Sequence, residues 1–222
     1  GHGHCPIECY KKENGLKYTS SLIQLHLDER LLALREAAKG RRDPTAEDDT
    51  LQYLLLTAEQ IAPARILEIG AAEGLTSVSL LLSTRAKLTA IECDGERAAK
   101  ARENFRAFGV ENRVTLIEED AASALPALTG EYDLIFLDGP KVQYRRYLPE
   151  LKRLLREGGV LLSDDVLLFG WVSGEEAVPQ KRRMLVEHIR EYLSLLSSDP
   201  DLITQVLEIG EGLAVSVKRR KS

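Results

Sequence analysis

A short apolar run that leads into a glycine-rich turn constrains the fold more than any other feature of the chain. Residues 66–74 read Ile-Leu-Glu-Ile-Gly-Ala-Ala-Glu-Gly. A buried strand, a glycine-rich turn and the start of a helix form the arrangement with which α/β proteins bind a nucleotide-like ligand. Glycines in the turn let the backbone bend sharply and approach the ligand closely. The run therefore predicts an α/β fold with a ligand site at the end of a strand.

The spacing of the acid and the glycines separates two classes of ligand. Glu68, Gly70 and Gly74 give E-x-G-x-x-x-G, which lacks the first glycine of the G-x-G-x-x-G motif that binds a dinucleotide pyrophosphate. The spacing suits a cofactor without phosphates, such as S-adenosylmethionine, whose amino-acid end can lie over the turn. A dinucleotide-dependent oxidoreductase is therefore the less favoured alternative.

Strands and helices alternate along the chain from Arg65 onward. The predicted strands are Arg65–Ile69, Lys87–Glu92, Arg113–Glu118, Tyr132–Leu137 and Gly159–Ser163. The predicted helices are Thr76–Ser83, Gly95–Phe108, Ala121–Leu128, Tyr144–Arg156 and Pro179–Leu196. This alternation implies a parallel sheet that is covered by helices on both faces.

The C-terminal segment distinguishes between folds of this kind. Leu202–Glu208 and Leu213–Lys218 read as a hairpin whose turn contains Gly210 and Gly212. An antiparallel last strand beside an otherwise parallel sheet is typical of S-adenosylmethionine-dependent methyltransferases, whereas a dinucleotide dehydrogenase does not need one. We therefore predict an α/β, doubly wound, mostly parallel seven-stranded sheet with an antiparallel C-terminal strand, the Rossmann-like fold of class I methyltransferases.

The segment before this alternation predicts an N-terminal helical extension over residues 19–62, so that the methyltransferase domain spans residues 63–222. Apolar residues at helical spacing indicate a helix from about Ser20 to Lys39, which ends at Arg41-Arg42-Asp43-Pro44. A second helix is predicted from Thr45 to Ile61, before Pro63. The apolar faces of these helices suit a lid or a homodimer contact. Residues 1–18 are expected to be disordered or derived from a tag, because the chain begins Gly-His-Gly-His.

Composition and charge exclude several classes of protein. The net charge of −5 does not favour a generic nucleic-acid binder. No apolar run approaches the ~20 residues of a membrane span, and no secretory signal opens the chain, so we expect a cytoplasmic protein with no membrane partner. The three cysteines, Cys5, Cys9 and Cys93, are too few for a disulfide scaffold. His2, His4, Cys5 and Cys9 could bind a metal, although terminal disorder is the favoured interpretation.

Two predicted strands end near acids that could bind the parts of a nucleoside. Glu92 ends the second strand, where an acid accepts hydrogen bonds from ribose hydroxyls in nucleotide-binding folds. Asp120 follows the third strand and precedes Ala121, so its carboxylate could accept from an adenine amino group while the alanine leaves room for the ring. Asp120 could equally cap the helix that starts at Ala121.

Three further acids are predicted to meet at the tips of adjacent strands. Asp138 follows the fourth strand, and Asp164 and Asp165 follow the fifth. Such carboxylates repel one another unless they are protonated or bound to a metal. Oxygen ligands suit a hard divalent cation, Mg²⁺ or Mn²⁺. Lys141 lies one turn beyond Asp138, and a nearby cation would favour its neutral form, which could take a proton from a substrate hydroxyl.

Together these motifs resemble the metal-dependent O-methyltransferases of the catechol and caffeoyl-CoA type. The resemblance covers roughly residues 44–220. It rests on Leu67-Glu68-Ile69-Gly70 with Gly74 and Thr76, Ile91-Glu92, Asp120-Ala121, Leu137-Asp138-Gly139-Pro140-Lys141 and Asp164-Asp165. It implies S-adenosylmethionine as cofactor, with contacts from Ala46, Glu68, Gly70, Gly74, Thr76, Glu92, Asp120, Ala121 and Asp138.

The same resemblance implies a catalytic site. Asp138, Asp164 and Asp165 would bind the metal, and Lys141 would act as the general base beside Asp138. The family usually has Asn at the position of Asp165, and a third anion would make the bound metal less electrophilic. A non-catalytic domain that keeps the cofactor fold is disfavoured, because Asp138, Lys141 and Asp164 are all present.

Downstream residues are similar to the bacterial branch that methylates 5-hydroxyuridine at the wobble position of tRNA. They are Val166–Val172, Lys181-Arg182-Arg183 and Gly210–Ser216. Both 5-hydroxyuridine and a catechol offer two neighbouring oxygens, so tRNA and a small catechol-like substrate are both candidate acceptors. The basic residues that could contact tRNA phosphates are Arg145, Arg146, Lys181, Arg182 and Arg183.

Overall fold

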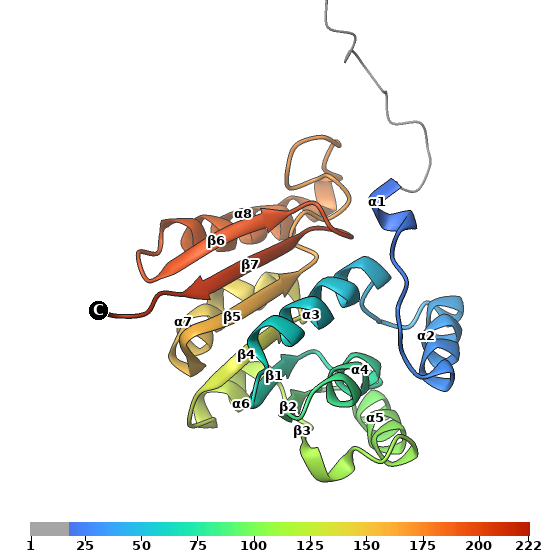
Figure 1. Ribbon diagram of the computed structural model, residues 1–222. Helices are drawn as coiled ribbons and strands as arrows, with labels where there is room; N and C mark the ends of the chain where they lie inside the picture. Colours follow the sequence, from blue (N-terminus) through green and yellow to red (C-terminus); the bar gives the residue numbers. More distant parts are fainter. Residues whose placement is uncertain (1–17) are drawn as a thin grey trace, which may run out of the picture.

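The computed structural model describes residues 18–222, in which seven strands form one sheet (Figure 1). Their order across the sheet is β3-β2-β1-β4-β5-β7-β6. The strands are β1 (Arg65–Ile69), β2 (Lys87–Ile91), β3 (Val114–Ile117), β4 (Tyr132–Leu137), β5 (Leu155–Asp164), β6 (Leu202–Leu207) and β7 (Leu213–Lys218). β7 is antiparallel to both of its neighbours, and the other neighbouring pairs are parallel. The predicted fold class is therefore confirmed.

Helices cover both faces of the sheet, as the alternation predicts (Figure 1). One face packs against α2 (Glu29–Arg41), α3 (Asp48–Ile61), α4 (Leu75–Ser83) and α5 (Gly95–Ala107). The other face packs against α6 (Ala121–Ala127), α7 (Tyr144–Leu154) and α8 (Arg183–Ser198). Neighbouring residues of β1 contribute to opposite cores, Ile66 to the first and Leu67 to the second, and both are fully buried. Burial on both faces explains why this strand reads as a continuous apolar run.

The N-terminal segment departs from the prediction of one helix from Ser20 to Lys39. A short α1 (Tyr18–Ser21) is followed by a non-helical stretch, and α2 begins only at Glu29. Asp28 defines that start, because its carboxylate accepts a hydrogen bond of 2.9 Å from the Arg30 N–H. Leu25 and Leu27 pack against the core from the non-helical stretch, so their apolar character did not signal a helix.

The second predicted helix also starts later than expected, at Asp48 rather than Thr45. The buried Arg35 side chain holds residues 45–47 outside the helix. Its Nη2 donates to the Ala46 carbonyl oxygen at 2.8 Å and to Asp48 Oδ1 at 2.9 Å. The predicted break after α2 is confirmed, since Arg42 adopts a left-handed conformation with φ of 59°.

Boundaries near β5 and α8 also differ from the predictions by two to four residues. β5 begins at Leu155 rather than Gly159, because Leu155 pairs with Tyr132 across an irregularity in the β4–β5 ladder. As a result α7 ends at Leu154, before the predicted Arg156. The helix predicted from Pro179 begins as a 3₁₀ turn, η3 (Gln180–Arg182), and becomes α-helical at Arg183. Two other 3₁₀ turns are η1 (Glu111–Arg113) and η2 (Lys141–Gln143).

Some predictions concern residues before Tyr18 or properties of the whole chain. The expected tag or disorder of the first residues and the possible ligands His2, His4, Cys5 and Cys9 lie outside the described residues. Among residues 18–222, no helix has both the length and the apolar character of a membrane span. The cytoplasmic location and the boundary between residues 62 and 63 stay predictions.

The close approach of Gly70 to the backbone after β4 can be tested by substitution. Its φ is +85°, and an added Cβ would overlap the carbonyl oxygen of Asp138. We expect Gly70→Ala to destabilise the fold by about 3 kcal/mol or more, because it combines backbone strain with a clash against main chain. Gly40, near the end of α2, has no atom within 4 Å of an added Cβ, and Gly40→Ala should be neutral or stabilising by up to ~1 kcal/mol. Urea unfolding of both variants checks this, and equal midpoints would contradict it.

Candidate active site

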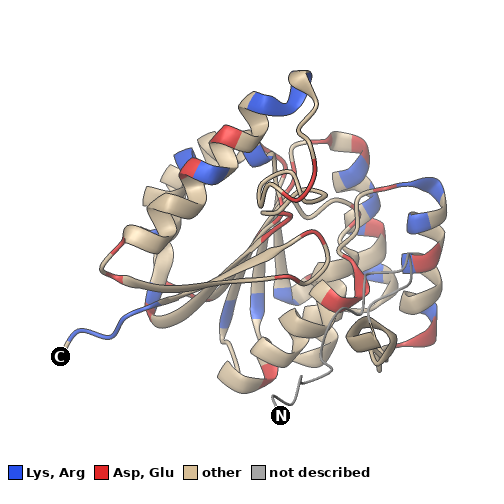
Figure 2. Cartoon of the chain, turned by 90° about the horizontal axis from the view of Figure 1, so that it is seen from above, with Lys and Arg blue, Asp and Glu red and all other residues tan. Residues whose placement is uncertain are grey.

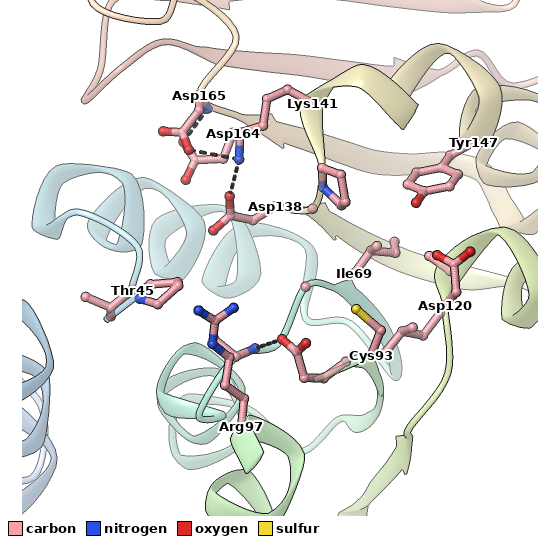
Figure 3. Close-up of a pocket in the computed structure, with 18 of the residues that line it drawn as sticks. Thr45, Ile69, Cys93, Arg97, Asp120, Asp138, Lys141, Tyr147, Asp164 and Asp165 are labelled. Atoms are coloured by element: carbon pink, nitrogen blue, oxygen red, sulfur yellow. Dashed lines mark hydrogen bonds and ion pairs between the residues drawn. The ribbon is translucent and has the colours of Figure 1, made fainter. Parts of the chain in front are cut away.

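One cavity opens where the parallel strands reach their carboxyl ends, and its volume is about 530 Å³ (Figure 3). The loops after all five parallel strands, β1 to β5, contribute to its lining, together with residues before α3 and the turn at Glu211. Predicted site residues that line it are Gly70, Glu92, Asp120, Ala121, Asp138, Lys141, Asp164 and Asp165. A smaller recess beside it is lined by Ala46, Glu68, Gly70, Thr76 and Asp138. The structure thus brings together every predicted site residue except Gly74.

Gly74 lies outside the lining of both hollows. It adopts a left-handed conformation with φ of +77° just before α4, and an added Cβ would lie 2.6 Å from the Phe105 ring. This glycine is therefore required where α4 packs closely against α5. A contact between Gly74 and the cofactor stays a prediction.

Glu92 is held by the backbone of two loops at the edge of the cavity. Its Oε1 accepts from the Ala72 N–H at 2.8 Å, and its Oε2 accepts from the Asp94 N–H at 3.0 Å. Each carboxylate oxygen has a second lone pair, so both can still accept from neighbouring hydroxyls. The side chain is almost fully buried yet lines the cavity. This geometry fits a ribose diol.

Glu68 lies deeper, at the recess beside the main cavity. Its Oε2 accepts from the Ser77 hydroxyl at 2.7 Å, and the residue is 1% exposed. Burial raises the pKa of Glu68 to about 8, and the charges of Asp138 and Glu92 add to this effect, although the Ser77 hydrogen bond opposes it. At neutral pH the side chain is therefore mostly protonated until a cationic group, such as an ammonium, approaches it.

Asp120 and Tyr147 mark the opposite end of the cavity (Figure 3). Asp120 occupies the N-cap position of α6 by its backbone angles, but its side chain makes no capping hydrogen bond and so remains available to a ligand. The Tyr147 hydroxyl is buried without a hydrogen-bond partner among the described residues. Burial raises the pKa of Tyr147 to about 12, with a further contribution from the charge of Asp120. An orphaned hydroxyl and a free carboxylate fit the polar edge of a nucleobase.

The three acids predicted at the strand tips do meet. Oxygen atoms of Asp138, Asp164 and Asp165 all lie within 4.8 Å of one another. Burial raises the pKa of Asp164 well above its usual range, and the charges of Asp138 and Asp165 raise it further. Burial also raises the pKa of Asp138, against the opposing charge of Lys141. The cluster therefore carries more negative charge than its surroundings compensate.

Lys141 is the cation that the chain itself provides to this cluster (Figure 3). Its Nζ lies 2.8 Å from Asp138 Oδ1 and 2.9 Å from Asp165 Oδ2. Burial alone would lower the pKa of Lys141, but the charges of Asp138 and Asp165 outweigh burial and raise it. While both acids are free, the lysine therefore keeps its proton, in contrast to the neutral form expected beside a metal.

The donor set fits a hard divalent cation. All three side chains offer carboxylate oxygens, with no sulfur or imidazole among the clustered groups of the described chain. A cation would also stabilise the charged forms of Asp138 and Asp164, which burial disfavours.

Several lining residues were missed by the sequence analysis. Thr45 and Glu47 reach the cavity because residues 45–47 are not helical, and Leu168, Phe169 and Glu211 reach it from distant loops. Burial raises the pKa of Glu47 to about 7, and the charges of Asp49, Glu211 and Asp165 contribute. Thr45 and Glu47 belong to no local motif. Leu168, Phe169 and Glu211 lie in Val166–Val172 and Gly210–Ser216, the segments similar to the tRNA-methylating branch, but that resemblance assigned them no place in the site.

Comparisons with known proteins agree with this geometry. The profile of the O-methyltransferase family matches residues 24–220. The chain is 30% identical over 203 residues to the caffeoyl-CoA O-methyltransferase of Populus kitakamiensis, covering 84% of this chain and 85% of that protein. It is 32% identical over 146 residues to the catechol O-methyltransferase of Mycobacterium tuberculosis, covering 62% and 66%.

A solved structure supports the cofactor class. The methyltransferase PaMTH1 of Podospora anserina, with S-adenosylhomocysteine bound, has a TM-score of 0.79 and 27% identity, covering 87% of this chain and 89% of that one. The dinucleotide oxidoreductase and the non-catalytic domain are therefore set aside. The chain belongs to the O-methyltransferase family and is an S-adenosylmethionine-dependent O-methyltransferase.

Proposed function

We propose that the chain methylates a hydroxyl that has a neighbouring oxygen, with a divalent cation, most simply Mg²⁺, in the acidic cluster. The observation that carries this proposal is the meeting of Asp138, Asp164 and Asp165 in the same cavity as Glu92. Two neighbouring oxygens form a chelating pair, which suits an acceptor bound at a carboxylate-held cation. When bound, the cation would lower the pKa of the acceptor hydroxyl and stabilise its negative charge.

The cofactor would span the cavity from the glycine turn to Asp120. Its amino-acid end would lie by Gly70 and the recess that Ala46, Glu68 and Thr76 line. Its ribose would bind Glu92, and its base would lie by Asp120, Ala121 and the orphaned hydroxyl of Tyr147. This direction points the methyl group toward Asp138, so donor and acceptor are held close together.

Lys141 is the proposed general base. It lies beside Asp138 and retains its proton only because Asp138 and Asp165 are free to pair with it. Once the charges of these acids are taken up by a cation, the ion pairs weaken and the burial of Lys141 favours its neutral form. The neutral amine can then accept the proton of the acceptor hydroxyl.

We propose 5-hydroxyuridine in tRNA as the acceptor, with a small catechol as the second candidate. Lys181, Arg182 and Arg183 are exposed, and within residues 18–222 none of them forms an ion pair. Lys181 and Arg182 lie in η3 and Arg183 begins α8, a helix that contacts η2 (Lys141–Gln143). Figure 2 colours the basic residues of the chain blue. Arg146 is also exposed, but Arg145 is paired with Glu191 at 2.7 Å and is less available to phosphates. The small acceptor is supported by the names of the caffeoyl-CoA and catechol relatives.

A homodimer is part of the same proposal. An apolar groove lies between the start of the described chain and α3, lined among others by Ile23, Tyr53 and Ile209. Tyr18, Leu22 and Leu56 are exposed nearby. Covering such a surface with a second copy would bury apolar area. Sedimentation equilibrium tests the homodimer, because a dimer has twice the 24.7 kDa mass of one chain.

Removal of the Glu92 carboxylate should weaken cofactor binding. We expect Glu92→Ala to reduce the affinity for S-adenosylhomocysteine at least tenfold, about 1.4 kcal/mol, because hydrogen bonds to a charged acceptor are lost. Glu131→Ala, an exposed acid just before β4, is the control and should bind normally. Calorimetry measures both, after circular dichroism has shown that they fold. Unchanged affinity of Glu92→Ala would remove Glu92 from the site.

Metal binding can be measured without turnover. Manganese titrations followed by electron paramagnetic resonance should show one site in the wild type, weakened at least tenfold in Asp164→Asn because a charged ligand is lost. Asp165→Asn should weaken it less, since the metal-dependent family that this chain resembles usually has Asn at that position, and Glu131→Gln should leave it unchanged. Methylation should also stop in excess chelator. Equal binding by wild type and Asp164→Asn, or activity that chelator leaves intact, would contradict the metal assignment.

The acceptor proposal is tested by the basic residues before α8. Replacing Lys181, Arg182 and Arg183 together with Ala should slow methylation of hydroxyuridine-containing tRNA at least tenfold and leave catechol methylation unchanged. Added salt should have the same selective effect, because phosphate contacts release counterions. A wild-type enzyme that methylates catechol efficiently and leaves this tRNA unmodified would select the small acceptor instead.

A further inference from the structure

The loop that follows β5 has an unusual backbone. Asp165, Leu168 and Phe169 all adopt left-handed conformations, with φ of 57°, 46° and 56°. Residues other than glycine seldom adopt this conformation, and it persists only where the surroundings impose it. Some other part of the chain must therefore hold residues 165–169 in place.

Glu211 supplies that restraint from the turn between β6 and β7. Its carbonyl oxygen accepts from the Leu167 N–H at 2.8 Å and from the Leu168 N–H at 3.2 Å. Its carboxylate Oε2 accepts from the Phe169 N–H at 2.7 Å. Three consecutive N–H groups thus converge on one residue. Two of them contact its backbone carbonyl oxygen, and the Phe169 N–H alone contacts the carboxylate.

The turn that carries Glu211 is itself anchored on both sides. The Gly210 N–H donates to Asp49 Oδ2 in α3 at 3.1 Å, and the Gly212 carbonyl accepts from the Val166 N–H at 3.1 Å. An added Cβ on Gly212 would overlap the Leu167 side chain, so turn and loop are in close contact. Glu211 therefore joins the loop after β5 to a turn whose position is fixed by α3 and the sheet.

This loop forms one wall of the candidate active site. It starts directly after Asp164, the last residue of β5, and Leu168, Phe169 and Glu211 all line the cavity. The wall lies on the side of the acidic cluster, whereas Glu92 and Asp120 lie after β2 and before α6. A change in the loop would therefore affect the acceptor side of the cavity and leave the cofactor side in place.

We propose that Glu211 is a positioning residue for the acceptor, which it serves by holding in place the loop of residues 165–169, with its left-handed Asp165, Leu168 and Phe169. This proposal rests on the proposed function, in that the wall by Asp164 and Asp165 faces the acceptor. It assigns Glu211 no contact with the reacting atoms. The carboxylate acts through the Phe169 N–H and hence through the shape of the wall.

The restraint can be measured in the protein without any ligand, by amide hydrogen exchange. We expect Glu211→Ala to speed exchange of the Phe169 amide at least tenfold, because the carboxylate no longer accepts from it. The Leu167 and Leu168 amides should change less, because they donate to the backbone carbonyl of residue 211, which the variant keeps. Glu211→Gln keeps the length and an acceptor oxygen but loses the charge, so it should speed exchange about threefold and serves if Glu211→Ala does not fold. Glu111→Ala, an exposed acid in η1, is the control. Wild-type exchange in both Glu211 variants would overturn the proposal.

Kinetics then distinguish a positioning role from general damage. With Mg²⁺ and catechol, Glu211→Ala should raise the KM for catechol at least tenfold, while calorimetry gives an affinity for S-adenosylhomocysteine within twofold of wild type. Loss of cofactor affinity in step with the KM would overturn the acceptor-side assignment. If wild-type protein methylates no tested acceptor, the proposed function fails, and the exchange result still decides whether Glu211 holds the loop.

Discussion

The close contact of β1 with β4 at their carboxyl ends is the constraint on which the site depends. Gly70 lies so close to the Asp138 carbonyl that no side chain fits between them. The Asp138 N–H donates to the Ile69 carbonyl oxygen at 2.9 Å. The buried Tyr144 hydroxyl lies within hydrogen-bond distance of the Leu137 and Asp164 carbonyls, which joins the tips of β4 and β5. The backbone therefore fixes the acids of the cluster, and their mutual repulsion cannot separate them.

Electrostatics at this point favour binding over stability. Three carboxylates and one lysine share a partly buried place, and burial of the carboxylates raises the pKa values of Asp138 and Asp164, which is a cost to their charged forms. A raised acid pKa in the folded state means that stability is lost as pH rises above the unfolded value near 3.8. The fold carries this cost because its hydrophobic cores on both sheet faces support the strand tips. A bound cation would recover that free energy.

What the sequence could predict was local. The strand β1, the glycine turn and the acids Glu92, Asp138 and Asp164 sit in contiguous motifs whose geometry follows from strand, turn and helix rules, and the structure places them together. What failed depended on tertiary contacts. The helix expected over Ser20–Lys39 is interrupted because Leu25 and Leu27 find the core without helical geometry. Likewise, Tyr147 and Phe169 reach the cavity through packing that no spacing rule encodes.

The two sides of the cavity differ in how many parts of the chain define them. The proposed cofactor side is built mainly from the loops after β1, β2 and β3, where Glu92 accepts from the Ala72 N–H and Asp120 precedes α6. The acceptor side depends on three distant segments: the start of α3, the loop after β5 and the turn at Glu211. A change in any one of these can reshape the acceptor wall while the methyl donor stays in place. We infer that such a separation lets one fold serve acceptors of different size, such as those that name the caffeoyl-CoA and catechol relatives. It also ties the cofactor class to local motifs and the acceptor to tertiary contacts.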